Sequence, residues 1–301
     1  MKNKLTKEWF FKTKWGNVAM ISWGDRHRPG VLLVHGYMDS AATFEALVSL
    51  LPDTYHYVSF DFPGHGKSDH VLSNLLVPQG LVVEIIKEIV KHLQWRSFVC
   101  IAHSMGCAIV TLYQHLYPGR ITKMIHIDPL VALTVYYYFN EIHGFWFQWY
   151  YEYYYDHYFL YNSAPPRLYT REQLIESTMV TRHLTREQAE IVLSRSLVPV
   201  ENGLFRVSTQ PIMRRMINLP AFKDAFSRIL QHNIPPTLCI HATKSEIPKA
   251  EREFVDKFFR TDKKRLNVYF DAHHDLHITH ASDLVPTILN FLNRKSVEAK
   301  L

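Results

Sequence analysis

The pattern of hydrophobic and polar positions divides the first part of the chain into alternating strands and helices. Short continuous apolar runs are typical of buried strands, and they lie at residues 31–34, 57–62, 98–102 and 122–127. Segments with apolar residues at helical spacing lie between them, at residues 41–51, 81–93 and 106–116. An earlier pair, 9–13 and 18–22, flanks the turn Trp15-Gly16-Asn17 and predicts a β-hairpin.

The alternation stops near Pro129 and resumes near residue 237. Residues in between read as helical and aromatic, without clear strands, and the pattern then returns as strand 237–241, helix 249–259, strand 266–270 and a final helix, 284–292. Strands alternating with helices predict an α/β fold with a mostly parallel sheet flanked by helices. We therefore expect a core of residues 1–130 and 223–301, and a helical, aromatic-rich cap of residues 131–222 inserted after the strand that ends near Asp128.

Composition changes this picture little. The chain has 301 residues, of which 47% are hydrophobic, enough for a sizeable core. The net charge of +6 comes from scattered basic residues, without a basic run interleaved with aromatics. This excludes nucleic acid as the expected partner and allows a mild preference for anionic substrates or surfaces.

Targeting and redox signals are sparse. The start of the chain is polar, so we expect no signal peptide, and no apolar run is long enough for a transmembrane segment. Three cysteines, Cys100, Cys107 and Cys239, fit neither a zinc site nor a disulfide framework, which favours an intracellular compartment. The oligomeric state is not predicted.

Ser104 carries the first chemical signal. It lies in Ala102-His103-Ser104-Met105-Gly106, between an expected strand and an expected helix. A sharp strand-to-helix turn needs small residues two positions before and after the serine, as in the nucleophile elbow G-x-S-x-G. Ala102 replaces the first glycine of that pattern. The alternative is that Ser104 is only the N-cap of the helix.

A second turn, His35-Gly36, ends the strand at 31–34. Such a turn can present the Tyr37 backbone N–H to an oxyanion, and the N–H of Met105, directly after the serine, would be the second donor. The alternative is a plain turn that ends a strand.

The loop Asp61-Phe62-Pro63-Gly64-His65-Gly66-Lys67-Ser68 follows the next strand. Together with His35-Gly36, the segment around Ser104 and a late histidine, its order along the chain resembles the α/β-hydrolase superfamily. The resemblance implies the α/β-hydrolase fold and a nucleophilic role for Ser104. We interpret His65 as a structural residue.

The late histidine comes from Asp271-Ala272-His273-His274-Asp275-Leu276-His277, directly after the last strand. The resemblance implies that the general base lies on this loop. Counting back from the final helix favours His274, with His273 and His277 as alternatives.

The acid is harder to assign. The superfamily often reads G-x-x-D after the strand at 237–241, and here Ser245 stands at the aspartate position. Two carboxylates remain: Asp128, at the end of the strand 122–127, and Glu246. We favour Asp128 as the catalytic acid and keep Glu246 as the alternative acid. Asp128 could instead be only a cap before Pro129, and Glu246 only an exposed acid in the first turn of a helix.

Further segments narrow the resemblance. Nearly the whole chain resembles the serine hydrolase-like protein family. The segments that carry this resemblance are residues 34–44, 61–68, 198–204 and 273–277. Members resemble serine esterases and are in part peroxisomal. This resemblance implies Ser104 as nucleophile and leaves the acid open.

We therefore expect a serine hydrolase that acts on carboxylic ester or thioester bonds of a small apolar, acyl-type substrate. Ser104, His274 and Asp128 would form the triad, and Tyr37 and Met105 the oxyanion hole. The alternative is a catalytically weak ligand-binding or scaffold protein of the same fold, which the altered acid position and Ala102 favour. The sequence has no metal-binding cluster and no Gly-rich phosphate loop, so no cofactor or metal is expected.

Two segments give weaker signals. The aromatic residues of 136–161 are too dense for one helix face. We expect them to form part of a cap over Ser104 that selects an apolar acyl group. The alternatives are that the rings only pack the cap against the core, or that they form an exposed patch. The chain ends in Ala299-Lys300-Leu301, a variant of the Ser-Lys-Leu peroxisomal signal. It predicts recognition by the peroxisomal import receptor and a peroxisomal location, with the cytoplasm as the alternative.

Overall fold

The computed structural model of the chain describes residues 4–71, 74–219, 223–259 and 264–294. An eight-stranded sheet forms its centre, with the strand order β1-β2-β4-β3-β5-β6-β9-β10. The strands are β1 (Thr6–Lys12), β2 (Asn17–Trp23), β3 (Gly30–Val34), β4 (His56–Phe60), β5 (Phe98–His103), β6 (Ile121–Ile127), β9 (Thr237–Ala242) and β10 (Arg265–Phe270). The expected peroxisomal signal, Ala299-Lys300-Leu301, lies outside the described residues.

The sheet is mostly parallel, as the sequence predicted. β1 and β2 form the expected antiparallel hairpin, and β2 also runs antiparallel to β4. Every neighbouring pair from β4 across to β10 is parallel. The carboxyl ends of β3, β5, β6 and β9 therefore meet at one edge of the sheet. Residues that follow these strands are brought together there, although they are far apart in the sequence.

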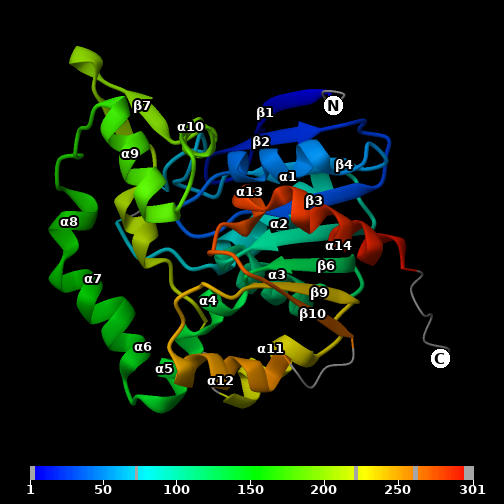
Figure 1. Cartoon of the computed structure of the whole chain (residues 1–301). Helices are drawn as coiled ribbons and strands as arrows, with labels where there is room; N and C mark the ends of the chain where they lie inside the picture. Colours follow the sequence, from blue (N-terminus) through cyan, green and yellow to red (C-terminus); the bar gives the residue numbers. More distant parts are fainter. Residues whose placement is uncertain (1–3, 72–73, 220–222, 260–263, 295–301) are drawn as a thin grey trace.

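Helices cover both faces of the sheet (Figure 1). Successive side chains of a strand point to opposite faces, so Leu32 and Val34 pack in one core and Val31 and Leu33 in another. The first core is closed by α2 (Gly80–His92) and α3 (Met105–Leu116), and the second by α1 (Glu45–Leu50) and α14 (Ala281–Asn293). α11 (Lys223–Gln231) and α12 (Lys249–Phe259) also flank the sheet.

The segment between β6 and β9 is largely helical. Up to Leu193 its helices are α4 (Leu130–Leu133), α5 (Val135–Glu141), α6 (Phe145–Phe147), a π-helical turn at Gln148–Glu152, α7 (Tyr153–Asp156), α8 (Tyr158–Asn162), α9 (Arg171–Arg182) and α10 (Arg186–Leu193). α9 and α10 each begin at a capping box, where Thr170 pairs with Gln173 and Thr185 with Gln188. No helix of the described residues combines the length and apolar character needed to cross a membrane.

The segment also contains a feature that the sequence analysis did not predict. β7 (Leu197–Pro199) and β8 (Phe205–Val207) pair antiparallel in a small separate sheet. Asn202 and Gly203, with φ of 60° and 70°, allow the chain to reverse between them. Strands of three residues are too short to show the period-two pattern, so the residue pattern does not predict them.

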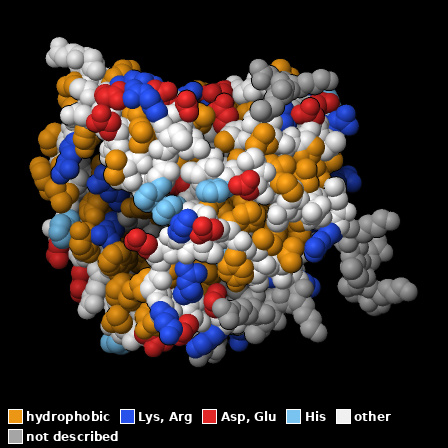
Figure 2. Space-filling model, viewed as in Figure 1, with side chains coloured by type: hydrophobic (Ala, Val, Ile, Leu, Met, Phe, Trp, Pro, Cys, Tyr) orange, Lys and Arg blue, Asp and Glu red, His pale blue; other side chains and the backbone are white. Residues whose placement is uncertain are grey.

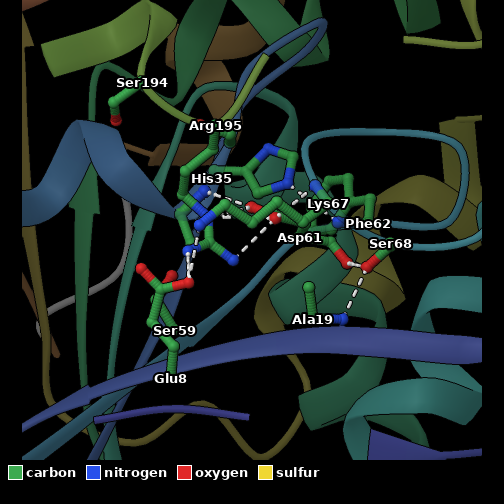
Figure 3. A network of polar contacts seen from close by, with 12 residues as sticks. Glu8, Ala19, His35, Ser59, Asp61, Phe62, Lys67, Ser68, Ser194 and Arg195 are labelled. Carbon is green, nitrogen blue, oxygen red and sulfur yellow. Dashed lines mark hydrogen bonds and ion pairs between the residues drawn. The ribbon is translucent and has the colours of Figure 1, made fainter. Parts of the chain in front are cut away.

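The loop after β4 forms a buried polar network (Figure 3). The Asp61 carboxylate accepts hydrogen bonds from the backbone amides of Ala41, at 2.8 Å, and Lys67, at 2.9 Å. It also pairs with the buried Arg195 at 2.9 Å. A Cβ at Gly66 would lie 2.3 Å from the Asp61 Cγ, so only glycine fits there. Arg195 follows α10, and the network therefore fastens the helical segment to the sheet.

Candidate active site

Ser104 lies on the turn between β5 and α3, at the carboxyl edge of the sheet. Its backbone has a φ of 50° and a ψ of −121°, an uncommon conformation for a residue other than glycine. Gly106 makes this turn possible, because a Cβ there would lie 2.4 Å from the Val34 carbonyl oxygen. The backbone conformation is strained in the way expected of a nucleophile elbow.

His274 reaches Ser104 from the loop between β10 and α13 (Leu276–Thr279). Its Nε2 lies 2.8 Å from the Ser104 Oγ, and its Nδ1 lies 2.6 Å from the Asp128 Oδ2. With the Nδ1 proton donated to Asp128, the Nε2 is free to accept the Ser104 hydroxyl proton. The structure thus brings together Ser104, His274 and Asp128 in one chain of hydrogen bonds.

Asp128 follows β6 and is 1% exposed, so its carboxylate depends on protein partners. Its Oδ1 accepts the Ala242 amide at 3.1 Å, and its Oδ2 accepts the Ser245 hydroxyl as well as His274. Burial raises the pKa of the Asp128 carboxyl, but the hydrogen bonds from His274, Ser245 and Ala242 outweigh it and hold the pKa below its ordinary value. The carboxylate is therefore ionised at neutral pH.

The alternative acid, Glu246, is placed differently. It is exposed on the segment after β9 and has no hydrogen bond to His274 among the described residues. Ser245, at the position where the superfamily often has its aspartate, touches Asp128 instead. Sequence reasoning noted the missing aspartate at Ser245 but not this hydrogen bond.

The two expected oxyanion donors come from two separate segments of the chain. Tyr37 follows β3, and Met105 is the first residue of α3, where backbone N–H groups lack an intrahelical acceptor. Within the described residues, neither of the two amides donates a backbone hydrogen bond outside its own element. Both N–H groups therefore remain candidates for the oxyanion hole.

A cavity of about 510 Å³ opens beside Ser104. Its apolar lining comes from Tyr37, Met38 and Val131, and charged side chains such as Arg182 and Lys244 line other parts. None of the described residues in 136–161 lines it. The expectation that these aromatic rings contact a substrate at Ser104 thus finds no support in the cavity.

Arg182, at the end of α9, was missed by the sequence analysis. Its guanidinium donates to the Asp275 carboxylate at 2.6 and 2.8 Å and to the Asp39 carboxylate at 3.2 Å. Asp275 directly follows His274, so this ion pair holds the histidine loop against α9 and the turn after β3. A lone arginine in the last turn of an amphipathic helix carries no sequence signal for such a role.

Two buried histidines complete this cluster. The His103 and His277 rings are tilted against each other, with 4.0 Å between their centroids, and with Asp39 and Asp275 they place four potential metal ligands within 4.8 Å of one another. Both carboxylates already accept hydrogen bonds from Arg182, so we assign the cluster a structural role. Burial lowers the pKa of His103 to about 4 and that of His277 well below its ordinary value, so both rings are neutral at pH 7. The third histidine of the loop, His273, stacks on His183 instead.

Comparison with known proteins shows which family the chain belongs to. Residues 29–281 match the family described as alpha/beta hydrolase fold. The chain belongs to the α/β-hydrolase fold family. The resemblance to serine hydrolase-like proteins is confirmed as well: the protein of that name from Danio rerio is 26% identical over 97% of this chain and 90% of its own length. Serine hydrolase-like protein 2 of Homo sapiens is 29% identical over 63% of this chain, and the match spans 60% of that relative's length.

Solved structures support the same fold. A hypothetical protein from Pseudomonas aeruginosa superposes with a TM-score of 0.81 at 20% identity, over 96% of this chain and 100% of that one. A thioesterase domain from the curacin biosynthetic pathway gives 0.79 at 20% identity, over 95% and 99%. At this identity the likeness shows the fold alone. The family relationship shows that this chain is a hydrolase, and the comparisons do not identify its substrate.

Proposed function

We propose that the protein is a serine hydrolase of carboxylic ester or thioester bonds. The observation that carries the proposal is the continuous chain from the Ser104 Oγ through His274 to Asp128, with distances of 2.8 and 2.6 Å. An N-cap serine needs no such chain, and Ser104 makes no side-chain capping hydrogen bond to its helix.

In this mechanism the His274 Nε2 takes the Ser104 proton while the Oγ attacks the carbonyl carbon of the substrate. The Tyr37 and Met105 amides stabilise the tetrahedral oxyanion, a contribution of about 3–4 kcal/mol for a single donor in comparable sites. The imidazolium then protonates the leaving alcohol or thiol, and an acyl-enzyme remains on Ser104. Water, activated by His274, attacks the acyl carbonyl and releases the acid. Asp128 holds the histidine tautomer and stabilises the imidazolium throughout.

The cavity suggests the scale of the substrate. Its volume of about 510 Å³ lies within the range of sites for small molecules. The apolar side chains of Tyr37, Met38 and Val131 would contact an apolar acyl group of modest length. The charged groups around the rest of the cavity favour a polar leaving group.

Hydrolysis of p-nitrophenyl esters and acyl-CoA thioesters of graded acyl length tests the proposal. We expect turnover of at least one series by the wild-type protein and a loss of at least a thousandfold in Ser104→Ala, with the fold preserved by circular dichroism. Absence of turnover across both series, or equal turnover by Ser104→Ala, would contradict it.

We also propose that the protein is imported into peroxisomes, since the chain ends in Ala299-Lys300-Leu301. A fluorescent reporter carrying the last twelve or so residues should enter peroxisomes and become diffuse when Leu301 is removed. A diffuse signal in both cases would count against this proposal.

A further inference from the structure

A second cavity, of about 800 Å³, lies at the edge of the sheet opposite Ser104. Its walls come from β1, the end of β2, the loop 25–28, His56 at the start of β4 and the end of α2. β3 and β4 are parallel, and His56 and the loop before Gly30 mark their amino ends. Ser104 follows the carboxyl end of β5, which is parallel to β3. The second cavity is therefore separate from the candidate active site.

The cavity is basic. Four cationic side chains line it against two carboxylates, which gives a formal charge of +2 with the imidazoles neutral. Both carboxylates have partners among the residues that line the cavity. Asp53 lies 3.4 Å from Lys4, and Asp25 accepts the backbone amide of His27 at 3.0 Å.

Three of the cations have no carboxylate within ion-pair distance among the described residues: Lys7, Arg26 and Arg28. Arg26 donates to the neighbouring His27 ring, at 3.4 Å. Like charges gathered around one concavity repel each other, and a bound anion would relieve that repulsion. A guanidinium group binds phosphate oxygens through paired N–H donors, and Arg26 and Arg28 bring two such groups to the cavity lining.

The cavity also has an apolar wall. Leu5, Trp9 and Leu93 line it beside the basic groups, and the Leu5 side chain is 77% exposed. Lys7 lies 6.0 Å from the centre of the Trp9 ring, so the charged and aromatic parts adjoin. His56, which is 5% exposed, also lines the cavity, and its Nδ1 has no hydrogen-bond partner among the described residues. A simple inorganic anion would leave the apolar wall without a contact.

We propose that this cavity binds an organic phosphate, with the phosphate against Arg26, Arg28 and Lys7 and an aromatic or aliphatic group against Trp9, Leu5 and Leu93. The site is independent of the proposed hydrolysis at Ser104. Its ligand would be either a soluble phosphate ester or the headgroup region of an anionic phospholipid, which share this chemistry.

Titration calorimetry at low ionic strength tests the site with inorganic phosphate, phenyl phosphate and adenosine monophosphate. We expect saturable binding of the organic phosphates, at least fivefold tighter than inorganic phosphate, and weaker binding as salt is added. Arg26→Gln/Arg28→Gln should weaken it at least tenfold. In Trp9→Ala, the ratio of the affinity for organic phosphates to that for inorganic phosphate should fall toward one.

A matched control removes two positive charges elsewhere. Lys87→Gln/Arg186→Gln changes exposed cations that pair with Glu84 and Glu172, and it should change the affinity by less than threefold. An equal loss in this control would show general surface attraction and overturn the site. Ser104→Ala should bind as the wild type does, so a failure of the hydrolase proposal leaves this test intact.

Flotation with phosphatidylcholine vesicles containing 20% phosphatidic acid separates the two sources. The site would be assigned to a lipid headgroup if the protein binds the vesicles, if Arg26→Gln/Arg28→Gln abolishes this binding, and if the soluble phosphates show no saturable binding. Saturable binding of the soluble esters alone would assign it to a soluble ligand. Absence of both would overturn the proposal.

Discussion

The strand ends around Ser104 and the aromatic segment 136–161 are opposite in character. At the strand ends, Ser104, His274 and Asp128 each have a defined hydrogen-bond partner within 2.8 Å. In the aromatic segment, Tyr150 and Tyr154 are buried, whereas the Phe147, Trp149 and Phe159 side chains are 52%, 42% and 63% exposed. Hydrophobic side chains gather along the left of the molecule in Figure 2, where Figure 1 places α6 to α8.

The contrast between these two regions shows when the position of a functional group can be predicted from the sequence. Residues that directly follow parallel strands must meet at one edge of the sheet, so their position along the chain fixes their position in space. Aromatic composition carries no such constraint, because the rings can pack, line a cavity or face solvent. Arg215, for example, lies over the rings of Trp149 and Tyr153, at 4.6 and 3.7 Å, outside the cavity beside Ser104.

The largest expected effect is at the acid. Asp128→Asn should lower kcat by about a thousandfold to ten-thousandfold, because the amide no longer holds the His274 tautomer or stabilises its cation. Glu246→Gln, on the exposed neighbouring position, should change kcat by less than threefold. The two variants are compared by steady-state hydrolysis of the best ester. If only the Glu246 change abolished turnover, the assignment of Asp128 would be wrong.

Much of the fold and part of the site could be predicted before the structure. The hairpin and the parallel sheet follow from the apolar runs and turns. The approach of His274 to Ser104 was predicted from the resemblance to the superfamily together with the position of the final helix. The hydrogen bond from Ser245 to Asp128 and the ion pairs of Arg182 could not, because they depend on how separate loops approach each other. Local sequence holds no record of such long-range contacts.

A substitution at Ser245 should have a smaller effect on kcat, and it tests whether the acid can be supplied from another strand end. Its side chain reaches the same Asp128 oxygen as the His274 ring. An aspartate at 245 should therefore supply the acid from β9 in place of β6. Asp128→Asn/Ser245→Asp is expected to recover at least tenfold of the kcat lost in Asp128→Asn, with Asp128→Asn/Ser245→Asn as the uncharged control. A double variant no more active than its control would show that position 245 cannot serve His274.

Buried histidines predict a pH-dependent stability away from the site. Burial lowers the pKa of His126, in β6, to about 3, below its ordinary value of 6.5. Below pH 6.5 the His126 imidazole is therefore protonated in the unfolded chain but remains neutral in the folded chain. The free energy of unfolding decreases as the pH falls. His126→Phe should reduce the loss between pH 7.5 and 5.5 by about 1 kcal/mol in urea unfolding. The exposed His143→Phe should retain the wild-type dependence, and a His126 variant that also retained it would refute this account.

The smallest effect is expected in the aromatic segment. Phe147→Ala and Trp149→Ala should shift the acyl-length preference by less than twofold, because neither side chain lines the cavity beside Ser104. Met38→Ala and Val131→Ala, which enlarge the apolar part of that cavity, should favour longer acyl groups. The preference is measured as the ratio of kcat/KM for butyrate and octanoate esters. If this ratio changed more in Phe147→Ala and Trp149→Ala than in Met38→Ala and Val131→Ala, the aromatic segment would select the acyl group, contrary to this account.

Covalent labelling of Ser104 tests the central claim most directly. Intact-mass spectrometry after treatment with a fluorophosphonate should show one adduct per chain, mapped to Ser104 by digestion. Ser104→Ala should take up none, and His274→Ala should label at least a hundredfold more slowly, because the serine would lose its general base. A wild-type protein that remains unlabelled, or a Ser104→Ala variant that labels as fast as the wild type, would contradict the account.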